Sequence, residues 1–545
     1  MKKDRMILFA TVVAVCVGLA ACGNAPTNAT PDIDATNIVL SDTEITVDGK
    51  AISGSAQDPV YAANDIVFYL EGQDFTYGEG EAWEEHSQSE ADAHTVVHIA
   101  QPGTYRISGT LSKGQIAVDL GEDAVENPEA KVTLILDNVD ITCSVAPAVI
   151  FYHVYECGSG DADSATAQVD TTGAGANVII ADNSTNVIRG SHVARIYKSY
   201  ELSEDGTEVV DSKKLHKYDG AFYSKQSMNI TGGEADTGIL SIFGDNEGLN
   251  SELHLTINGG WIIINAGNDG INTNEDNVSV TTINGGKVHI HANGSTGEGD
   301  GIDSNGWLVI NGGEIIAQSS GISADAGLDS DMGTTVNGGT VIATGTMMDR
   351  IETQNQTSVT FRFDKTQEGS EGNGPGYYLQ DENEMTYLNY MPRNDFSILY
   401  FSSPDLTEGD YSFWMDTTQL SGVPMEGGGM MGRSEDFEPS ERPEMPEGFK
   451  PGERPEMPEG FEPGERPEMP EGFEPGERPE MPEGFKPGER PEMPEGFEPG
   501  EKSRFPRKDD GAGIMDTINT DYVSLIFTIT EGNNHFFVFQ PTTTP

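Results

Sequence analysis

The chain has 545 residues and a formal net charge of −59, and 65 of its residues are glycine. A surface of that sign repels nucleic acid and anionic membranes and attracts cations. We therefore expect no nucleic-acid partner. The four cysteines are too few and too scattered to indicate a zinc site.

The beginning of the chain has the features of a secretory signal. A short basic start is followed by the apolar stretch 6–21 and by the sequence Leu-Ala-Ala-Cys, which ends at Cys22. This ending resembles a bacterial lipobox, so we predict a lipoprotein signal peptide over 1–21 and lipidation of Cys22, the alternative being a chance cysteine. The acyl chains would anchor the protein at the extracellular face of the bacterial cell membrane. Residues 22–57 are small and polar, and we expect a flexible tether.

A repeat of 26 or 27 residues is the clearest pattern in the chain. In each repeat, apolar side chains alternate with period two before and after a Gly-Gly corner, as they do in strands. We expect positive φ at the corner glycines. A third short strand begins at a Gly-aliphatic pair. The corners begin at Thr231, Asn258, Asn284, Asn311 and Asn337, and the pairs begin at Gly220, Gly248, Gly270, Gly301 and Gly321.

Three strands in each repeat of this length are typical of a parallel β-helix, in which successive coils stack. The sequence therefore predicts an all-β fold, a right-handed parallel β-helix over 58–349. Irregular early coils are expected from about residue 95, with polar insertions between about 155 and 218. Cys143 continues an inward alternation, so a buried free thiol and a disulfide with Cys157 are equally compatible.

The end of the chain predicts two further kinds of structure. Residues 350–423 are expected to form a C-terminal β region that caps the open end of the solenoid. Five copies of a 12-residue sequence rich in Pro and Glu begin at residue 441, so we predict a disordered insertion over 424–510. Residues 511–545 are predicted to return to β strands.

Several of these segments together resemble a known family of bacterial cell-surface lipoproteins. The residues that carry the resemblance are Gly103–Leu111, Asp219–Lys225 and the Ile-Asn-Gly-Gly and Asp-Gly-Ile ladders. Members of this family bind calcium and carbohydrate on a parallel β-helix similar to that of pectate lyases. The resemblance implies binding of plant-wall polysaccharide, either acidic and of the polygalacturonate type or cellulose, with calcium as a structural or bridging ion.

Acidic and amide side chains recur at one corner of successive coils. Oxygens stacked about 4.8 Å apart suit calcium, which takes about six to eight oxygen ligands. The alternative is that Asp and Asn merely favour turns. We favour a bound cation, because uncompensated carboxylates at this spacing would repel one another. The candidate ligands are Asp245, Glu247, Asn250, Asn268, Asp269, Asn272, Asp300 and Asp303.

The strand after the Gly-Gly corner presents an outward tryptophan beside side chains that donate and accept hydrogen bonds. This combination suits stacking on a sugar ring. An equally compatible interpretation is that a long loop covers this face, because several of its outward residues are isoleucine. The candidate sugar-binding residues are Trp261, Lys287, His289 and His291, with Trp307 on the preceding strand as another platform.

A lyase would need a base close to a calcium-bound uronate. Lys225 is a weak candidate, and the strands Ile271–Asn274 and Ile302–Asn305 lack the lysines that members of the resembled family often carry. We therefore assign no catalytic residue and predict a monomeric protein that binds polysaccharide with calcium and without catalysis. The alternatives are a pectate-type polysaccharide lyase on the same scaffold and a structural or adhesion protein of the surface.

Overall fold

The structure is a computed structural model that describes residues 34–370, 374–425 and 523–539. The predicted signal peptide, Cys22 and nearly all of the predicted disordered insertion lie outside these residues. The chain divides into two units, and every described residue belongs to the unit formed by 1–431 and 519–545. Among the described residues, no helix has the length and apolar character that crossing a lipid bilayer requires.

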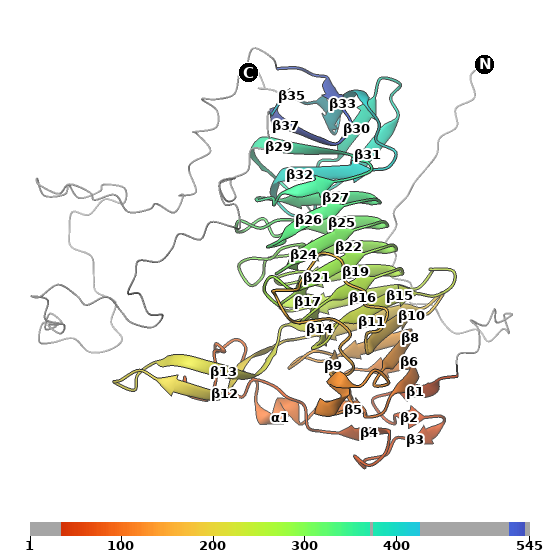
Figure 1. Cartoon of the computed structure of the whole chain (residues 1–545), viewed down its shortest axis with the longest axis vertical. Helices are drawn as coiled ribbons and strands as arrows, with labels where there is room; N and C mark the ends of the chain where they lie inside the picture. The colour runs from red at the N-terminus through yellow and green to blue at the C-terminus, as the bar shows by residue number, and fades with distance from the viewer. Residues whose placement is uncertain (1–33, 371–373, 426–522, 540–545) are drawn as a thin grey trace, which may run out of the picture. The chain divides into compact units, whose positions relative to one another are not determined.

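Three ladders of parallel strands run through the described part (Figure 1). Successive coils add one strand to each ladder, and each strand pairs with its equivalent in the next coil. This part of the chain is mostly β structure with long parallel sheets, as the sequence predicts, and it is consistent with a β-helix-like fold. The right-handed sense of the coil stays a prediction.

The long strands β6 and β8 pass through both the first and the second ladder. The first ladder contains β6 (Gly103–Leu111), β8 (Val132–Thr142), β10 (Ala176–Ile180), β15 (Met228–Gly232), β18 (Leu255–Ile257), β21 (Val280–Ile283), β24 (Trp307–Ile310), β26 (Gly333–Val336) and β28 (Ile351–Thr353). The second continues with β11 (Thr185–Gly190), β16 (Ile239–Gly244), β19 (Trp261–Ala266), β22 (Lys287–Ala292), β25 (Glu314–Gln318) and β27 (Thr340–Gly345). The third contains β5 (Thr95–Ile99), β7 (Gly114–Asp119), β9 (Val149–His153), β14 (Gly220–Ser224), β17 (Glu247–Ser251), β20 (Ile271–Thr273) and β23 (Ile302–Ser304).

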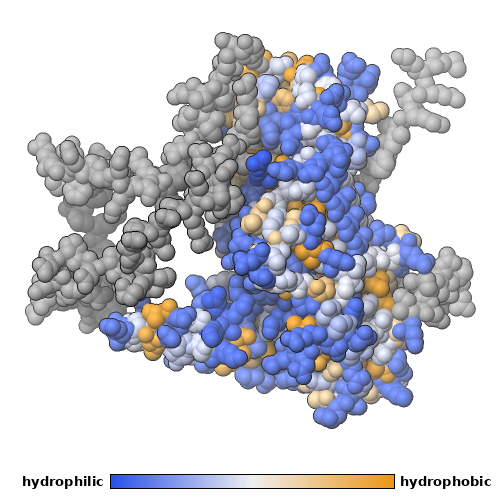
Figure 2. Space-filling model, in the orientation of Figure 1, coloured by the Kyte–Doolittle hydropathy of each residue, from blue (hydrophilic) through white to orange (hydrophobic). Residues whose placement is uncertain are grey.

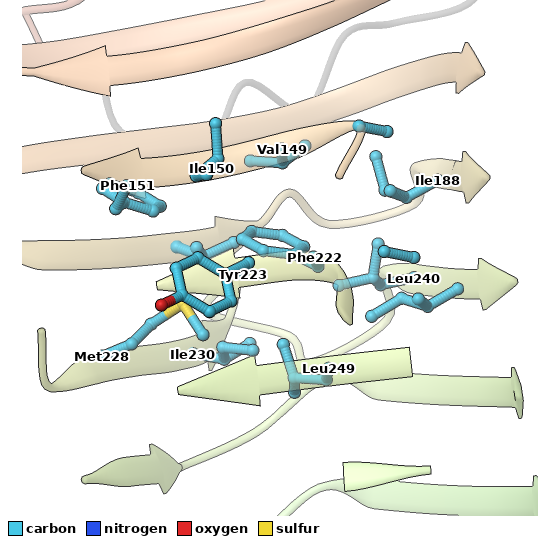
Figure 3. Packing of buried hydrophobic residues seen from close by; sticks show 14 of the residues in the cluster. Val149, Ile150, Phe151, Ile188, Phe222, Tyr223, Met228, Ile230, Leu240 and Leu249 are labelled. Carbon is cyan, nitrogen blue, oxygen red and sulfur yellow. The ribbon is translucent and has the colours of Figure 1, made fainter. Parts of the chain in front are cut away.

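Inward side chains from the three ladders form one core. Phe222, Ile230 and Leu240 come from three different ladders and lie together in the interior (Figure 3). Phe222 stands in register with Leu249, so it fills the aliphatic position that the sequence assigned to Ala221. Burying these apolar side chains at about 25 cal/mol per Å² is the main stabilising contribution to such a stack.

Cys143 and Cys157 are both free thiols, so the structure contains no disulfide between them. Cys143 is buried, and burial raises the pKa of its thiol to about 12. The thiol therefore stays protonated and packs as a small apolar group.

The Gly-Gly corners adopt the predicted conformation in four of the five repeats. The second glycine has a φ of 91° at Gly260, 82° at Gly286, 96° at Gly313 and 90° at Gly339, all in the region that glycine tolerates best. The first corner differs, since Gly233 does not have a positive φ.

The asparagines that precede these corners bond to one another along the stack. Asn284 Nδ2 donates to Asn258 Oδ1 at 2.9 Å, Asn311 Nδ2 donates to Asn284 Oδ1 at 2.8 Å, and Asn337 Nδ2 donates to Asn311 Oδ1 at 2.8 Å. Parallel coils repeat every 4.8 Å or so, which lets one amide reach the next. We call these four residues the asparagine ladder.

The prediction of a flexible tether over 22–57 is wrong for the second half of that range. β1 (Thr36–Leu40) pairs in parallel with β6, and β2 (Thr46–Val47) and β3 (Lys50–Ala51) add antiparallel strands. Ile38 and Leu40 are buried in the core, and this alternation was hidden by the polar average composition. β4 (Val60–Ala63) pairs with β5 in antiparallel fashion, and α1 (Gln88–Ala91) and a 3-10 turn at Glu122–Glu126 complete this region.

The region between 155 and 218, predicted to be polar insertions, also contains a regular coil. β10 and β11 pair within the ladders, and only the following segment forms an inserted hairpin of β12 (Val193–Leu202) and β13 (Val209–Tyr218). This hairpin projects as an arm from the ladders (Figure 1). Figure 2 shows hydrophobic side chains near its tip, where Leu202 and Val210 are exposed.

After the third-ladder strands end, the chain forms a mainly antiparallel β region around its own aromatic core. β32 (Phe396–Ser403) pairs antiparallel with β27, and β29 (Thr357–Gln367) lies on its other side. A stack of Phe361 on Phe413, with ring centroids 3.8 Å apart, lies in this second core. The remaining strands are β30 (Tyr377–Asp381), β31 (Thr386–Tyr390), β33 (Gly409–Met415), β34 (Thr418–Gln419), β35 (Ser421–Pro424), β36 (Phe527–Ile529) and β37 (Asn533–Phe539).

We expect Asn311→Ala to lower the free energy of unfolding by about 1–2 kcal/mol, because it removes two hydrogen bonds of the asparagine ladder. Asn337→Ala is the matched control, since within the ladder it removes a single bond. It should cost about half as much in urea unfolding. Equal losses for the two variants would show that the ladder does not contribute through its hydrogen bonds.

Candidate functional site

One face of the third ladder is built from oxygen-bearing side chains. Its later strands, β17, β20 and β23, share the order Gly, aliphatic, Asn or Asp, then Ser or Thr. The aliphatic residue points inward, so the next residue points outward, and strand pairing places Asn250, Asn272 and Asp303 in register. Leu328 forms a bridge with Ile302, which puts Asp329 in the following coil. We call Asn250, Asn272, Asp303 and Asp329 the outer oxygen column.

A second column of acids stands immediately before the glycines of these strands. Backbone bonds from Gly248 to Asp269 O and from Gly270 to Asp300 O align these positions in successive coils. Glu247, Asp269 and Asp300 form this set, which we call the corner oxygen column. The Asp300 N–H donates to Asp269 Oδ1 at 2.7 Å, so a carboxylate also satisfies a backbone donor of the next coil.

Amide side chains link the two columns. Glu247 Oε1 accepts a hydrogen bond from Asn272 Nδ2 at 2.9 Å, and Glu247 Oε2 accepts another from Asn250 Nδ2. The carbonyl oxygens of Asn268 and Asn272 are buried and have no hydrogen-bond partner. Buried acceptors of this kind are costly unless a donor or a cation satisfies them.

Burial raises the pKa of four carboxyl groups in these columns, those of Glu247, Asp269, Asp300 and Asp303. Burial first, and then the negative charges of Asp269 and Asp329, raise the pKa of Asp300 to about 9 and that of Asp303 to about 8. Burial likewise raises the pKa of Asp269 to about 7, against the bond from the Asp300 N–H. The pKa of Glu247 is raised well above its usual value by burial and by neighbouring acids. These shifts indicate negative charge that the protein does not compensate.

Calcium is the cation whose ligand chemistry these columns fit. In residues 34–370, 374–425 and 523–539, no group of three or more His, Cys, Asp and Glu side chains is disposed to hold a metal ion. The columns instead mix carboxylates with amide carbonyls, of which that of Asn272 lacks a partner, as does the neighbouring Asn268 carbonyl, and calcium accepts both kinds of oxygen. An ion at this face would thus be held by amides and carboxylates from successive coils.

Asp245 does not belong to this set of oxygens. Its carboxylate accepts hydrogen bonds from Ser191 Oγ and from His192 Nδ1, the latter at 3.1 Å. Both of its oxygens are therefore engaged on the other side of the corner. We remove Asp245 from the candidate calcium ligands, because its charge is already compensated by the ion pair with His192.

Sequence reasoning missed Asp329 because it placed the last third-ladder strand at Gly321. Ile322 is 56 % exposed, and the bridge to Ile302 is made by Leu328 instead. A usable signal existed, since Ala-Gly-Leu-Asp-Ser at 326–330 repeats Asp-Gly-Ile-Asp-Ser at 300–304. Comparing the residues after each glycine would have found Asp329.

Lys225, the weak catalytic candidate, lies at the beginning of the outer oxygen column. Tyr223 pairs with Asn250, and Lys225 follows two residues later with an exposed side chain. The neighbouring position of the next coil is Glu252, which forms an ion pair with Lys214 at 3.3 Å. The sequence-predicted lysine is thus near the oxygen face but on the arm side of it.

The outer face of the second ladder brings together three of the predicted sugar-binding residues. Trp261, Lys287 and Glu314 occupy one column, with His289 beside Lys287. Lys287 Nζ lies 5.8 Å from the Trp261 ring centroid, and the Trp261 and His289 rings meet edge to face at 6.1 Å. Glu314 accepts from Lys287 at 3.2 Å and from His289 at 2.9 Å. We call this interlocked set, in which Trp261 is 37 % exposed, the platform.

The fourth candidate, His291, is wrong as an exposed sugar contact. It is buried, and its Nε2 lies 2.7 Å from Asn394 Oδ1. The segment 391–395, between β31 and β32, covers this end of the strands. Arg393 reaches Asn265 Oδ1 at 3.2 Å, and its N–H donates to Gln318. The loop-covered interpretation thus holds for one end of the face, and the open interpretation holds for the end at Trp261.

Trp307 lies on a different ladder from Trp261. It pairs with Val280 and Gly333 in the first ladder and is half-buried. The two tryptophans therefore do not form one surface.

Phe243 and Arg189 belong to the outer face of the second ladder, and sequence reasoning did not single them out. Phe243 is 40 % exposed on β16, and the Arg189 guanidinium lies 5.4 Å from its ring centroid. Arg189 donates to Asp140 at 2.7 Å. The signal was weak, because extra residues between the corner at Thr231 and β16 shift Phe243 out of the regular repeat.

Comparisons with known proteins identify the family to which this chain belongs. No curated protein matches the sequence. A solved structure described as the polysaccharide lyase-like protein from C. thermocellum, gadolinium derivative, is similar with 21 % identity and a TM-score of 0.32 over 59 % of this chain and 97 % of that chain. A family described as carbohydrate-binding domain-containing protein matches residues 93–372, just over half of the sequence, and the chain belongs to this family.

Proposed function

We propose that this protein is a cell-surface lipoprotein that binds polysaccharide without cleaving it and uses calcium to do so. The observation that supports it most is the exposed Trp261 beside Lys287, His289 and Glu314 on the flat outer face of the second ladder, in a chain of a carbohydrate-binding family. The glycan we propose is of the plant-wall type, acidic like polygalacturonate or neutral like cellulose.

Each member of the platform has a separate role in this proposal. The Trp261 ring offers an apolar face to a sugar ring. Lys287 and His289 are held in place by Glu314, so they lose little conformational freedom when a glycan binds. Their N–H groups donate to hydroxyl or carboxylate oxygens of the sugar.

Calcium would bind at the two oxygen columns, held by Glu247, Asn272, Asp300 and Asp303. The bound ion supplies positive charge, which compensates the stacked carboxylates and attracts a uronate. The raised pKa values of Asp300 and Asp303 support this role, because they mark buried carboxyl groups beside other acids, whose charge a cation would compensate.

A native gel cast with polygalacturonate, or with a soluble cellulose derivative, tests the binding function. Trp261→Ala should weaken the retardation of the protein about tenfold or more, since a central tryptophan of an interface contributes on the order of 2 kcal/mol. Trp307→Ala is the matched control and should leave retardation unchanged, because that ring lies on another ladder.

Other outcomes of this gel separate the alternatives. A cleared zone in the gel, lost on Lys225→Ala, would identify a lyase. Unchanged mobility of the wild-type protein in both gels, with calcium and with chelator, would contradict polysaccharide binding and favour a structural role.

The raised pKa values at the proposed calcium site predict how the stability of the calcium-free protein depends on pH. The folded-state pKa values of Asp300 and Asp303 lie above the usual 3.8. The folded protein therefore holds these protons more tightly, and stability is lost as pH rises from about 4 through 9. In chelator, the thermal midpoint should fall by several degrees over this window, and added calcium should restore it most at high pH.

Asp303→Asn should flatten this loss and weaken the effect of calcium, because it reproduces the residue found at the same position in the two preceding coils. Asp58→Asn, which removes a charge from an exposed turn, is the control and should keep the wild-type slope. If Asp303→Asn and wild type lose stability equally between pH 5 and 9, the oxygen columns are not the source of the effect.

Membrane attachment through Cys22 is tested by Cys22→Ala, which should move the protein from the membrane fraction to the soluble fraction and abolish incorporation of labelled fatty acid. Cys16→Ala, within the signal, should remain attached. Membrane attachment of the Cys22 variant would exclude this anchor.

A further inference from the structure

The segment 71–86, which lies outside the residues matched by the family, carries an unusually exposed tryptophan. Trp83 is 59 % exposed, more than any other described tryptophan. Its ring centroid lies 5.5 Å from that of His192. A tryptophan ring that is held in place and open to solvent offers a large apolar face on which a ligand can stack.

Trp83 is held in place by a buried ionic clamp. Glu84 Oε1 lies 3.0 Å from His192 Nε2, and His192 Nδ1 lies 3.1 Å from Asp245 Oδ1. The His192 side chain is only 5 % exposed. Burial alone would lower its pKa, but the hydrogen bonds and charges of Asp245 and Glu84 raise that pKa to about 10. His192 is therefore a cation at neutral pH, bound on both sides by carboxylates.

Backbone bonds add to this clamp. The Glu79 N–H donates to Arg195 O at 2.9 Å, and the Tyr197 N–H donates to Tyr77 O at 2.9 Å. The segment is thus joined to the base of the β12–β13 arm as well as to the ladder. Trp83 is consequently presented by a fixed segment, which reduces the entropy lost on binding.

The clamp places Trp83 next to the outer face of the second ladder. Gly190 and Gly244 are paired at the ends of β11 and β16. Asp245 is the first residue after Gly244, and His192 is the second residue after Gly190. Phe243 stands immediately before Gly244 and points outward. His192, which the Trp83 ring contacts, therefore lies in the coil next to that of Phe243, on the side away from Trp261.

Trp261, Phe243 and the His192 contact of Trp83 belong to three successive coils. Trp261 pairs with Ile239, four residues before Phe243. The rise along four strand residues and the spacing between two coils therefore separate the backbone positions of Trp261 and Phe243 by about 14 Å. Each ring also has a cationic side chain beside it, namely Lys287, Arg189 and His192, and each of these cations pairs with an acid. The three sites share one construction, although they come from different parts of the chain.

We propose that Trp83 is a third stacking site for the same polysaccharide chain, which runs from Trp261 past Phe243 to the segment 71–86. This inference rests on the proposed function, because it extends that binding face. Its consequence is that affinity depends on glycan length, since only a long chain reaches all three rings.

The experiment is calorimetric titration of the full chain with two series of probes, cello-oligosaccharides and oligogalacturonides of about 3 to 10 sugars. For the wild-type protein, affinity should increase with length. Trp83→Ala should lower the affinity for the longest bound probe about tenfold or more and leave the shortest bound probe unchanged. Trp83→Tyr should retain most of the long-probe affinity, because an aromatic ring remains.

Two controls separate this inference from the function on which it rests. Phe75→Ala removes another exposed aromatic residue of the same segment and should leave binding unchanged. Trp261→Ala should weaken probes of all lengths. If Trp261→Ala weakens binding and Trp83→Ala matches wild type at every length, the third site is refuted while the proposed function stands. A wild-type protein that binds neither series overturns both.

Discussion

Every part of this structure depends on one constraint, the in-register stacking of parallel coils about 4.8 Å apart. Because each residue lies above its equivalent, any side-chain property is repeated along a line. Isoleucine repeated at Ile230, Ile257 and Ile283 gives a continuous core. Asparagine repeated at the corners gives a chain of amide hydrogen bonds. Acid repeated at Asp269 and Asp300 gives carboxyl groups whose pKa values rise, first because they are buried and then because neighbouring acids oppose ionisation.

The second and third ladders differ in how their outward charges are arranged, and their proposed roles follow from this difference. On the second ladder, sign alternates from coil to coil, so that Lys287 pairs with Glu314 and Arg189 pairs with Asp140. That face is electrically balanced, and its exposed rings remain available for contact. On the later coils of the third ladder, from Asn250 to Asp329, the outward positions are acids and amides, and their charge is left for a partner from solution. One scaffold can therefore offer a stacking surface and a cation-attracting surface on two sides.

The repeat itself was readable from sequence, whereas the contacts between distant segments were not. Period-two alternation and the glycine corners predicted the ladders, because these signals are local. The last position of the third ladder was misplaced because Gly321-Ile322 imitates the Gly-aliphatic pair, whereas Gly327 keeps both the regular spacing from Gly301 and the Gly-aliphatic-Asp order. His291 was misjudged because Asn394, far along the chain, covers it. Trp83 carried no periodic signal at all, and its importance depends on the clamp by His192.

The pairing of β35 with β37 has a consequence for the number of Pro-rich repeats between them. These strands are antiparallel neighbours, with Val423 opposite Phe537, so residues 426–522 leave and re-enter the same sheet at adjacent points. The entropy of closing such a connection grows only with the logarithm of its length, by about 0.6 kcal/mol for each doubling. Adding or removing one 12-residue copy should therefore change this closure entropy by only a small fraction of that amount, so the sheet tolerates a change in repeat number.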